Sequence, residues 1–370
     1  MCDHVLLHLS LIDGIGPAAI KAIIEHKPAS LEWSQLYLLA AHDWIQRFGC
    51  SEKAAYILVN GLKDQTLLES ELDLIYKKKI FWVTVLSDDY PLLLKHIHNP
   101  PPILYWQGSL ASLHNNHTLA VVGSRKANFY GQDAVDFLVP PLVQHGWTIV
   151  SGGALGVDSM AHNATLKAGG ATVVVLGSGL LHKYPQSNNR MFDAAIAQGG
   201  AVISCFPVDT PAYPNNFPIR NRIVSGLSKG CLVIQAAAKS GARITAQCAL
   251  DQGRDVFAVP GSIKDPLSAG CHDLIMQGAK LVASVDDIVS EYVVNQMNPR
   301  HYVQQTILDS TETIVHNSPA KNILAACVQP QSVEDLLMQT NCSLSELQTL
   351  LFELQMDGKI KQDFSGMWTI

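Results

Sequence analysis

Charged side chains and long hydrophobic runs are both scarce in this chain of 370 residues. Asp, Glu, Lys and Arg make up only 16% of it, whereas hydrophobic residues make up 48%. This balance is typical of a packed globular protein and excludes a largely disordered chain. The longest apolar runs are strand-sized, far short of the roughly 18 residues that span a bilayer. Residues 1–12 are apolar but lack a basic leader and a small-residue cleavage site, so we expect neither a signal peptide nor a membrane partner.

The eight cysteines form no C-x-x-C pair and no Cys/His cluster with metal-ligand spacing. Several lie inside apolar runs, as buried reduced thiols do, so we expect a cytoplasmic protein without a bound metal. The net charge of −6 gives no support to nucleic-acid binding, because dedicated binders are usually basic overall. Any such role must depend on a local basic patch.

Short apolar strands that break into Gly- and Ser-rich loops are abundant between Val121 and Gly261. Examples are VVGSR (121–125), IVSGGALGVD (149–158) and LVIQAAAKSGA (232–242). Strands of this kind alternate with helix-length segments, and this alternation predicts βαβ units in a mainly parallel sheet. We therefore expect an α/β fold with an extended Rossmann-like, doubly wound sheet. Loops at the carboxyl ends of such strands place backbone N–H groups where an anion can bind.

Composition and periodicity predict four parts in the chain. Residues 1–65 form a small all-α domain, whose Gly-rich turn at 12–17 is similar to a helix-hairpin-helix or SAM-like turn, or is simply a tight connection between two helices. Residues 66–295 form the core and 296–317 a polar linker. Residues 318–370 have the outline of a winged helix, with three lysines against six carboxylates. This negative balance disfavours duplex DNA and favours a packing or protein-contact role.

Cationic side chains follow several of the predicted strands at the point where a helix begins. Arg125 and Lys126 follow the first core strand, Arg220 and Arg222 begin a helix, and Lys239 and Arg243 flank another helix start. Cations at a helix N-terminus are unfavourable unless an anion neutralises them. The alternative for Arg125 is a surface ion pair. We expect these loops to converge on one basic pocket for a phosphate-bearing ligand.

Signatures of a nucleotide-dependent enzyme are missing. G-x-G-x-x-G is absent, so we expect no dinucleotide cofactor. Asp158 and His162 share a helix face, but no nucleophile accompanies them and a structural role is favoured. A phosphoribohydrolase of the lysine-decarboxylase-like type is an alternative, although only Pro260-Gly261-Ser262 approaches its P-G-G-x-G-T turn. A protein-interaction scaffold that binds no DNA is the other alternative.

Five motifs in series resemble the DNA-processing protein A (DprA/Smf) family of recombination mediators. They are SGGALGVDSMAH (151–162), VLGSGLLHKYPQSNN (175–189), FPIRNRIVSGLS (217–228), SGARITAQCAL (240–250) and GRDVFAVPG (253–261). The resemblance implies a homodimeric, non-enzymatic protein that uses no nucleotide cofactor. It further implies binding to single-stranded DNA and loading of RecA recombinase during natural transformation.

The resemblance and the cationic loops described above together give a set of expected site residues. The expected DNA contacts are Gly123, Ser124, Arg125, Lys126, Ser151, Gly152, Gly153, Asn188, Asn189, Phe217, Arg220, Asn221, Arg222, Lys239, Ser240, Gly241 and Arg243. The expected dimer contacts are Leu274, Ile275 and Leu281. The sequence departs from the family pattern at several positions; for example, the turn at 184–189 has no lysine after the proline, and Gln235-Ala236 stands where many relatives have Glu-Ala.

Overall fold

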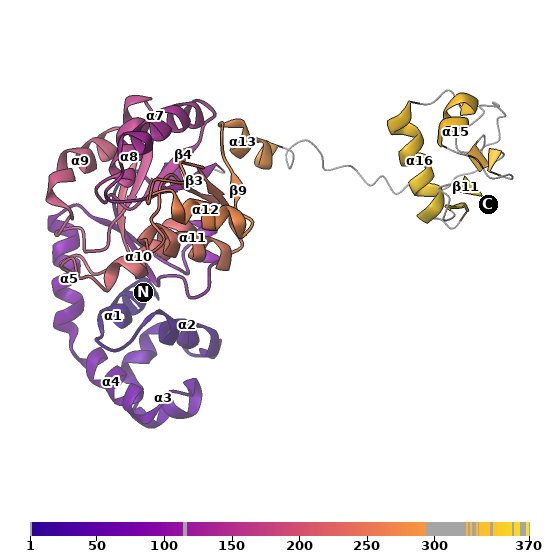
Figure 1. Ribbon diagram of the computed structural model, residues 1–370. Helices are drawn as coiled ribbons and strands as arrows, with labels where there is room; N and C mark the ends of the chain where they lie inside the picture. The colour runs from indigo at the N-terminus through magenta and orange to yellow at the C-terminus, as the bar shows by residue number, and fades with distance from the viewer. Residues whose placement is uncertain are drawn as a thin grey trace, which may run out of the picture. The chain divides into compact units, whose positions relative to one another are not determined.

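A mainly parallel sheet organises the larger part of the chain (Figure 1). The structure is a computed structural model, and it describes residues 2–113, 117–293, 323–324, 326–327, 331, 333–340, 343–356, 359–362 and 368–369. The chain divides into two compact units, Met1–Pro299 and Arg300–Ile370, which are considered separately. The predicted linker at 296–317 lies outside the described residues, and the predicted domain boundary near residue 65 stays a prediction.

Over residues 2–113 and 117–293 the sheet has nine strands, in the order β1-β2-β6-β5-β4-β3-β7-β8-β9. The strands are β1 (Phe81–Thr84), β2 (Ile103–Gly108), β3 (Thr118–Val122), β4 (Thr148–Ser151), β5 (Thr172–Val175), β6 (Ala201–Ser204), β7 (Gly230–Val233), β8 (Asp255–Ala258) and β9 (Lys280–Leu281). All neighbouring pairs from β6 to β9 are parallel, whereas β1 and β2 are antiparallel additions at one edge. The predicted α/β fold is confirmed.

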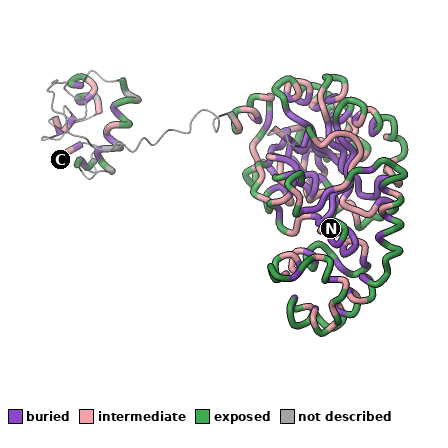
Figure 2. Tube along the Cα trace, turned by 180° about the vertical axis from the view of Figure 1, so that it is seen from behind, coloured by how far each residue is buried: buried purple, intermediate pink, exposed green. Residues whose placement is uncertain are grey.

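Helices cover both faces of this sheet, which explains why its strands are almost wholly apolar. They are α7 (Phe129–Gln144), α8 (Val157–Lys167), α9 (Asn189–Ala197), α10 (Asn216–Gly226), α11 (Gly241–Asp251), α12 (Ala269–Met276) and α13 (Asp286–Val293). On β3, Leu119 and Val121 pack with α7 and α8, whereas Ala120 and Val122 pack with α10 and α11. Figure 2 shows the resulting buried interior.

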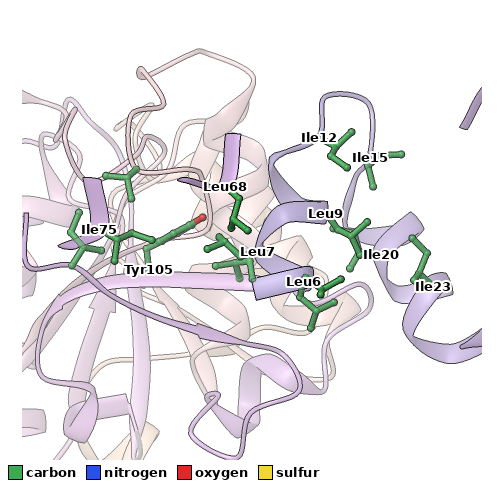
Figure 3. Close-up of a cluster of buried hydrophobic side chains, with 14 of the residues drawn as sticks. Leu6, Leu7, Leu9, Ile12, Ile15, Ile20, Ile23, Leu68, Ile75 and Tyr105 are labelled. Carbon is green, nitrogen blue, oxygen red and sulfur yellow. The ribbon is translucent and has the colours of Figure 1, made fainter. Parts of the chain in front are cut away.

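The N-terminal helices share a hydrophobic core with one end of the sheet. They are α1 (Cys2–Leu11), α2 (Pro17–His26), η1 (Trp33–Leu38), α3 (Ala41–Phe48), α4 (Glu52–Lys63) and α5 (Gln65–Lys77). Three shorter helices lie farther along the chain, in the connections between strands: α6 (Leu92–Lys95), η2 (Leu110–Leu113) and η3 (Gln186–Asn188). Leu7 of α1 and Leu68 and Ile75 of α5 are buried in the same cluster as Tyr105 of β2 (Figure 3). Between α1 and α2 the chain turns at Gly14, which has a φ of +84° that favours glycine.

The C-terminal unit has a small core of its own. Its described elements are α15 (Val333–Thr340), α16 (Leu344–Met356) and the antiparallel pair β10 (Lys361–Gln362) and β11 (Trp368–Thr369). Leu336, Leu347, Leu351 and Trp368 are buried together. These elements lie within residues 318–370, for which the sequence predicts the outline of a winged helix.

Within the part of the chain that the structure describes, none of the helices combines the length and apolar character needed to cross a membrane. In the same residues no group of His, Cys, Asp and Glu side chains is arranged to hold a metal ion. The described cysteines, Cys2, Cys50, Cys205, Cys231, Cys248, Cys271 and Cys327, are free thiols.

A buried carboxyl group connects α5 to the loop that follows β6. Glu71 is only 5% exposed, and its Oε1 accepts a hydrogen bond of 2.8 Å from the backbone N–H of Val208. Burial raises the pKa of the Glu71 carboxyl, and the hydrogen bond from Val208 offsets part of that rise. The ionised form is therefore disfavoured in the folded state relative to the unfolded chain.

We expect Glu71→Gln to remove a pH-dependent penalty. Since the folded-state pKa is raised, the native protein binds more protons than the unfolded chain between the ordinary and the raised pKa values. The free energy of unfolding of the wild type should therefore fall, relative to that of the variant, as pH rises through this window. Urea unfolding between about pH 4 and pH 8 measures this difference. Glu69→Gln, at an exposed position of the same helix, is the control; equal pH dependence in both variants would contradict the expectation.

Candidate functional site

The strand order reverses between β3 and β7. From β3 the chain builds the sheet in one direction through β4, β5 and β6, and then returns to the other side of β3 to add β7, β8 and β9. The loops after β3 and β7 consequently separate, and in doubly wound sheets ligands bind in the crevice that opens at such a point. A cavity of about 690 Å³ lies there, lined by residues that include Gly123–Arg125 and Lys239–Ala242.

Three helices present their first turns to this cavity. Asp158 of α8, Phe217 of α10 and Gly241 of α11 all line it. The start of α11 is capped by Ser240, whose side chain accepts a hydrogen bond of 3.2 Å from the N–H of Ala242. Helix N-termini carry unpaired N–H groups and a partial positive charge, so their convergence favours a negatively charged ligand.

An aromatic ring lies among the cations of the cavity. The Arg125 guanidinium carbon is 5.1 Å from the centre of the Phe217 ring, and that of Arg220 is 6.0 Å away. The Tyr184 ring is also near, with its centroid 6.0 Å from that of Phe217. Arg125 is exposed, so its charge can meet a ligand. This combination provides both a stacking surface and phosphate-binding groups.

Arg220 is the buried cation of the site. It is 3% exposed, and its Nη1 donates to the carbonyl of Val175 at 3.0 Å and lies 4.0 Å from a carboxylate oxygen of Asp158. Its Nε has no hydrogen-bond partner among the residues that the structure describes. Burial lowers the pKa of the Arg220 guanidinium and raises that of the Asp158 carboxyl, although each group offsets part of the other's shift.

Gly152 makes room for this arginine. A Cβ atom built on Gly152 would lie 1.4 Å from Nη1 of Arg220. No side chain fits at such a distance, so glycine is required while Arg220 keeps this position. Gly152 therefore lets a guanidinium approach the backbone at the end of β4.

His162 takes no part in the cavity's chemistry. Its side chain is fully buried, and Nδ1 is 2.7 Å from the hydroxyl of Thr172. Burial lowers the pKa of the imidazole to about 3, so it is neutral at physiological pH and cannot shuttle protons there. The structural interpretation of the Asp158/His162 pair holds.

Ten of the predicted DNA contacts lie together around the cavity: Gly123, Ser124, Arg125, Gly152, Phe217, Arg220, Asn221, Lys239, Ser240 and Gly241. Lys126 is exposed beside them. Others support the loops instead: Ser151 is buried and donates to the carbonyl of Val121 at 2.6 Å, and Asn188 donates to the carbonyl of Gly153 at 2.9 Å. Asn189 lines a neighbouring cavity.

Two predicted arginine contacts are outside this cavity. Arg222 directs its guanidinium to the backbone carbonyls of His98 and Asn99, the former at 2.7 Å. Arg243 is 3.0 Å from a carboxylate oxygen of Asp273. Both guanidiniums are therefore engaged within the protein, and neither residue lines the cavity.

The predicted dimer residues differ in accessibility. Leu281 is 44% exposed, but Leu274 is 4% exposed and packs in the core beneath α12. Ile275 is half-buried. The prediction that the Leu274 side chain contacts a partner is corrected by its burial, whereas Leu281 is available. Met276, which lies between Ile275 and Leu281 in the sequence and was not among the predicted contacts, is 78% exposed.

The surroundings of Gln235 favour glutamine over the glutamate of the family pattern. Its side-chain amide donates to Asn128 at 2.9 Å and to the carboxylate of Asp265 at 3.3 Å. A glutamate at this position would place a second carboxylate beside Asp265 and lose that donor. The backbone carbonyl of Gln235 also accepts from the N–H of Ser124 at 2.7 Å, which fixes the loop after β3.

Sequence comparison places these features among known proteins. The family model described as DNA recombination-mediator protein A matches residues 81–293. The chain is 43% identical over 209 residues to DNA processing protein DprA of Bacillus subtilis, which covers 56% of this chain and 70% of that protein. It is 30% identical over 386 residues to Protein Smf of Synechocystis, covering 96% and 95% of the two chains.

Solved structures agree with this assignment. DNA processing protein A from Streptococcus pneumoniae has a TM-score of 0.68 at 33% identity, and the match covers 79% of this chain and 98% of that one. DNA processing protein A from Helicobacter pylori, whose structure concerns its single-stranded DNA binding mode, has a TM-score of 0.52 at 28% identity, covering 58% and 96%. The resemblance read from the five motifs is thus confirmed, and the chain belongs to the DNA recombination-mediator protein A family of DprA and Smf proteins.

Proposed function

We propose that the cavity between the ends of β3 and β7 binds single-stranded DNA. The observation that carries this proposal is the convergence of three helix N-termini, the cations Arg125, Arg220 and Lys239, and the Phe217 ring on one cavity. The Helicobacter pylori relative, which binds single-stranded DNA, supports it.

A single strand suits this cavity better than a duplex does. Its phosphates can bind the guanidiniums and helix N-termini, while an unpaired base can stack on Phe217. In a duplex the bases are already stacked on one another, so no ring face is free for Phe217. Phosphate contacts and stacking do not distinguish bases, so the binding should tolerate many sequences.

The proposal extends to the biological role of the family. We propose that this chain acts as a homodimer in the cytoplasm and loads RecA recombinase onto single-stranded DNA during recombination and natural transformation. We further propose that it does so without a cofactor and without catalysing a reaction. Membership of the recombination-mediator family supports this role.

Arg125→Ala should weaken binding of an oligo-dT strand at low salt. Arg125 is exposed and stacks at 5.1 Å on Phe217, so its removal costs a phosphate contact. The slope of log K against log salt should become less steep by about 0.7 for each lost contact with a single strand. Arg222→Ala is the control, because its guanidinium serves the 98–99 backbone. Unchanged slopes in both variants, measured by fluorescence anisotropy, would contradict this site.

The phosphoribohydrolase alternative makes a different prediction. Among the described residues that line the cavity, Asp158 is the one carboxylate, and it is 8% exposed and engaged by Arg220. Since no accessible acid faces the cavity, incubation with nucleoside monophosphates should release no free base by chromatography. Sustained release that is lost in Arg125→Ala would instead favour the enzyme.

Leu281→Glu should dissociate the proposed dimer. Leu281 is 44% exposed, and a carboxylate in an apolar interface is costly to desolvate. Leu250→Glu is the matched control, because Leu250 is 47% exposed on α11. Sedimentation velocity should show a monomer for the first variant and a dimer for the second. A dimer in both would place the interface elsewhere.

A further inference from the structure

A second cavity adjoins the one assigned to DNA. It has a volume of about 600 Å³, and Tyr184 and Ala212 line both cavities. Most of its wall comes from the loop at 180–189, and Lys78 at the end of α5 and Gln107 of β2 complete it from outside the sequence motifs. The two cavities are therefore neighbouring parts of one groove, with the Tyr184 side chain at their junction.

The charge of the second cavity continues that of the first. Lys78 and Lys183 line it, and the described lining residues include no carboxylate. Carboxylates do line other cavities of the described structure, Asp3 and Asp89 in one and Asp133 in another. A groove that is cationic along both of its parts suits a polyanion longer than one nucleotide.

Side chains around the second cavity are already partly paired. The Lys183 ammonium is 3.5 Å from Asp193, and His182 Nε2 is 2.8 Å from Asp209. Asp193 and Asp209 are 73% and 67% exposed, so solvent screens both pairs and a phosphate can replace either carboxylate. Lys78 is exposed at the edge of the cavity.

Hydrogen bonds hold the walls of this cavity in place. Gly179 and Leu181 donate backbone hydrogen bonds of 2.8 Å and 3.1 Å to the carbonyls of Thr210 and Val208. Val208 in turn donates to Glu71 of α5, and Gln107 donates to the carbonyl of Lys78 at 3.3 Å. The helix that ends beside Lys78 is thus linked to both loops, so the cavity is built into the fold.

Tyr184 provides a second aromatic surface along the groove. Its side chain is 49% exposed, and its ring centroid is 6.0 Å from that of Phe217 with the planes inclined at 55°. Two inclined rings at this separation can each support a different base of one strand.

We propose that the second cavity holds the adjacent nucleotides of the single strand bound in the first, with Lys78 as a phosphate contact. This inference rests on the proposed function and extends it, because it assigns part of the DNA site to the N-terminal helical segment. Affinity should consequently increase with oligonucleotide length beyond what the first cavity accommodates.

The experiment compares Lys78→Gln with Lys77→Gln in the full-length protein. The two lysines are adjacent and exposed, and both changes remove one positive charge. Lys77 pairs with Asp73 at 2.6 Å and does not line the cavity. Oligo-dT strands of increasing length are titrated at several salt concentrations. For long strands, Lys78→Gln should make the slope of log K against log salt less steep by about 0.7, while the shortest bound strand should show no change. Lys77→Gln should match the wild type at every length.

A gain-of-function variant provides the second arm. Gln186 lines the same cavity, and Gln186→Lys should tighten binding of long strands and steepen their salt dependence without affecting the shortest strand. If the wild type binds strands of every length but Lys78→Gln and Lys77→Gln behave alike, or Gln186→Lys has no effect, the second cavity is not part of the path. If the wild type binds no oligonucleotide of any length, the proposed function itself is wrong.

Discussion

The burial of one guanidinium determines the shape of the whole site. Arg220 enters the protein at the start of α10, donates to the carbonyl at the end of β5 and approaches Asp158 of α8. This arrangement requires glycine at position 152, because no Cβ atom fits beside the guanidinium. Removing one member of a buried charged pair leaves the other uncompensated, which typically costs about 3–5 kcal/mol. The ends of β4 and β5, the start of α8 and the N-terminal half of α10 are therefore fixed together.

This buried charge also favours a negatively charged ligand in the cavity. Arg220 and Arg125 lie on the same aromatic ring, and among the described lining residues Asp158 is the one carboxylate that opposes them. The Arg220 guanidinium is buried in a region of low dielectric, where its charge acts more strongly than in water. A phosphate at this position would gain from the cations and from three helix N-termini at once. The pocket is basic although the chain carries a net charge of −6, because the charges that matter are local.

Much of this arrangement could be predicted from the sequence, because it depends on local chemistry. Apolar strands that end in glycine and serine predict a parallel sheet with loops at one edge, and cations after those strands predict a basic pocket. The direction of individual side chains could not be predicted in the same way. Arg220 and Arg222 are two residues apart, and that spacing places them about 200° apart around a helix. One consequently enters the cavity and the other serves the 98–99 backbone. The same spacing places Leu274 and Met276 on different sides of α12, where Leu274 is buried and Met276 is exposed.

The sequence did not indicate that Lys78 and Gln107 line a cavity, because only the tertiary fold brings the end of α5 and β2 beside the loop at 180–186.

The proposed function requires that the cavity between the ends of β3 and β7 holds the backbone of a single DNA strand. A crystal structure of the full-length protein with a short oligo-dT strand tests it most directly. We expect a phosphate within hydrogen-bond distance of the Arg125 guanidinium and of the backbone N–H groups at the starts of the loops after β3 and β7, with one base against Phe217. Density for the strand on another surface, with an unoccupied cavity between β3 and β7, would contradict the account.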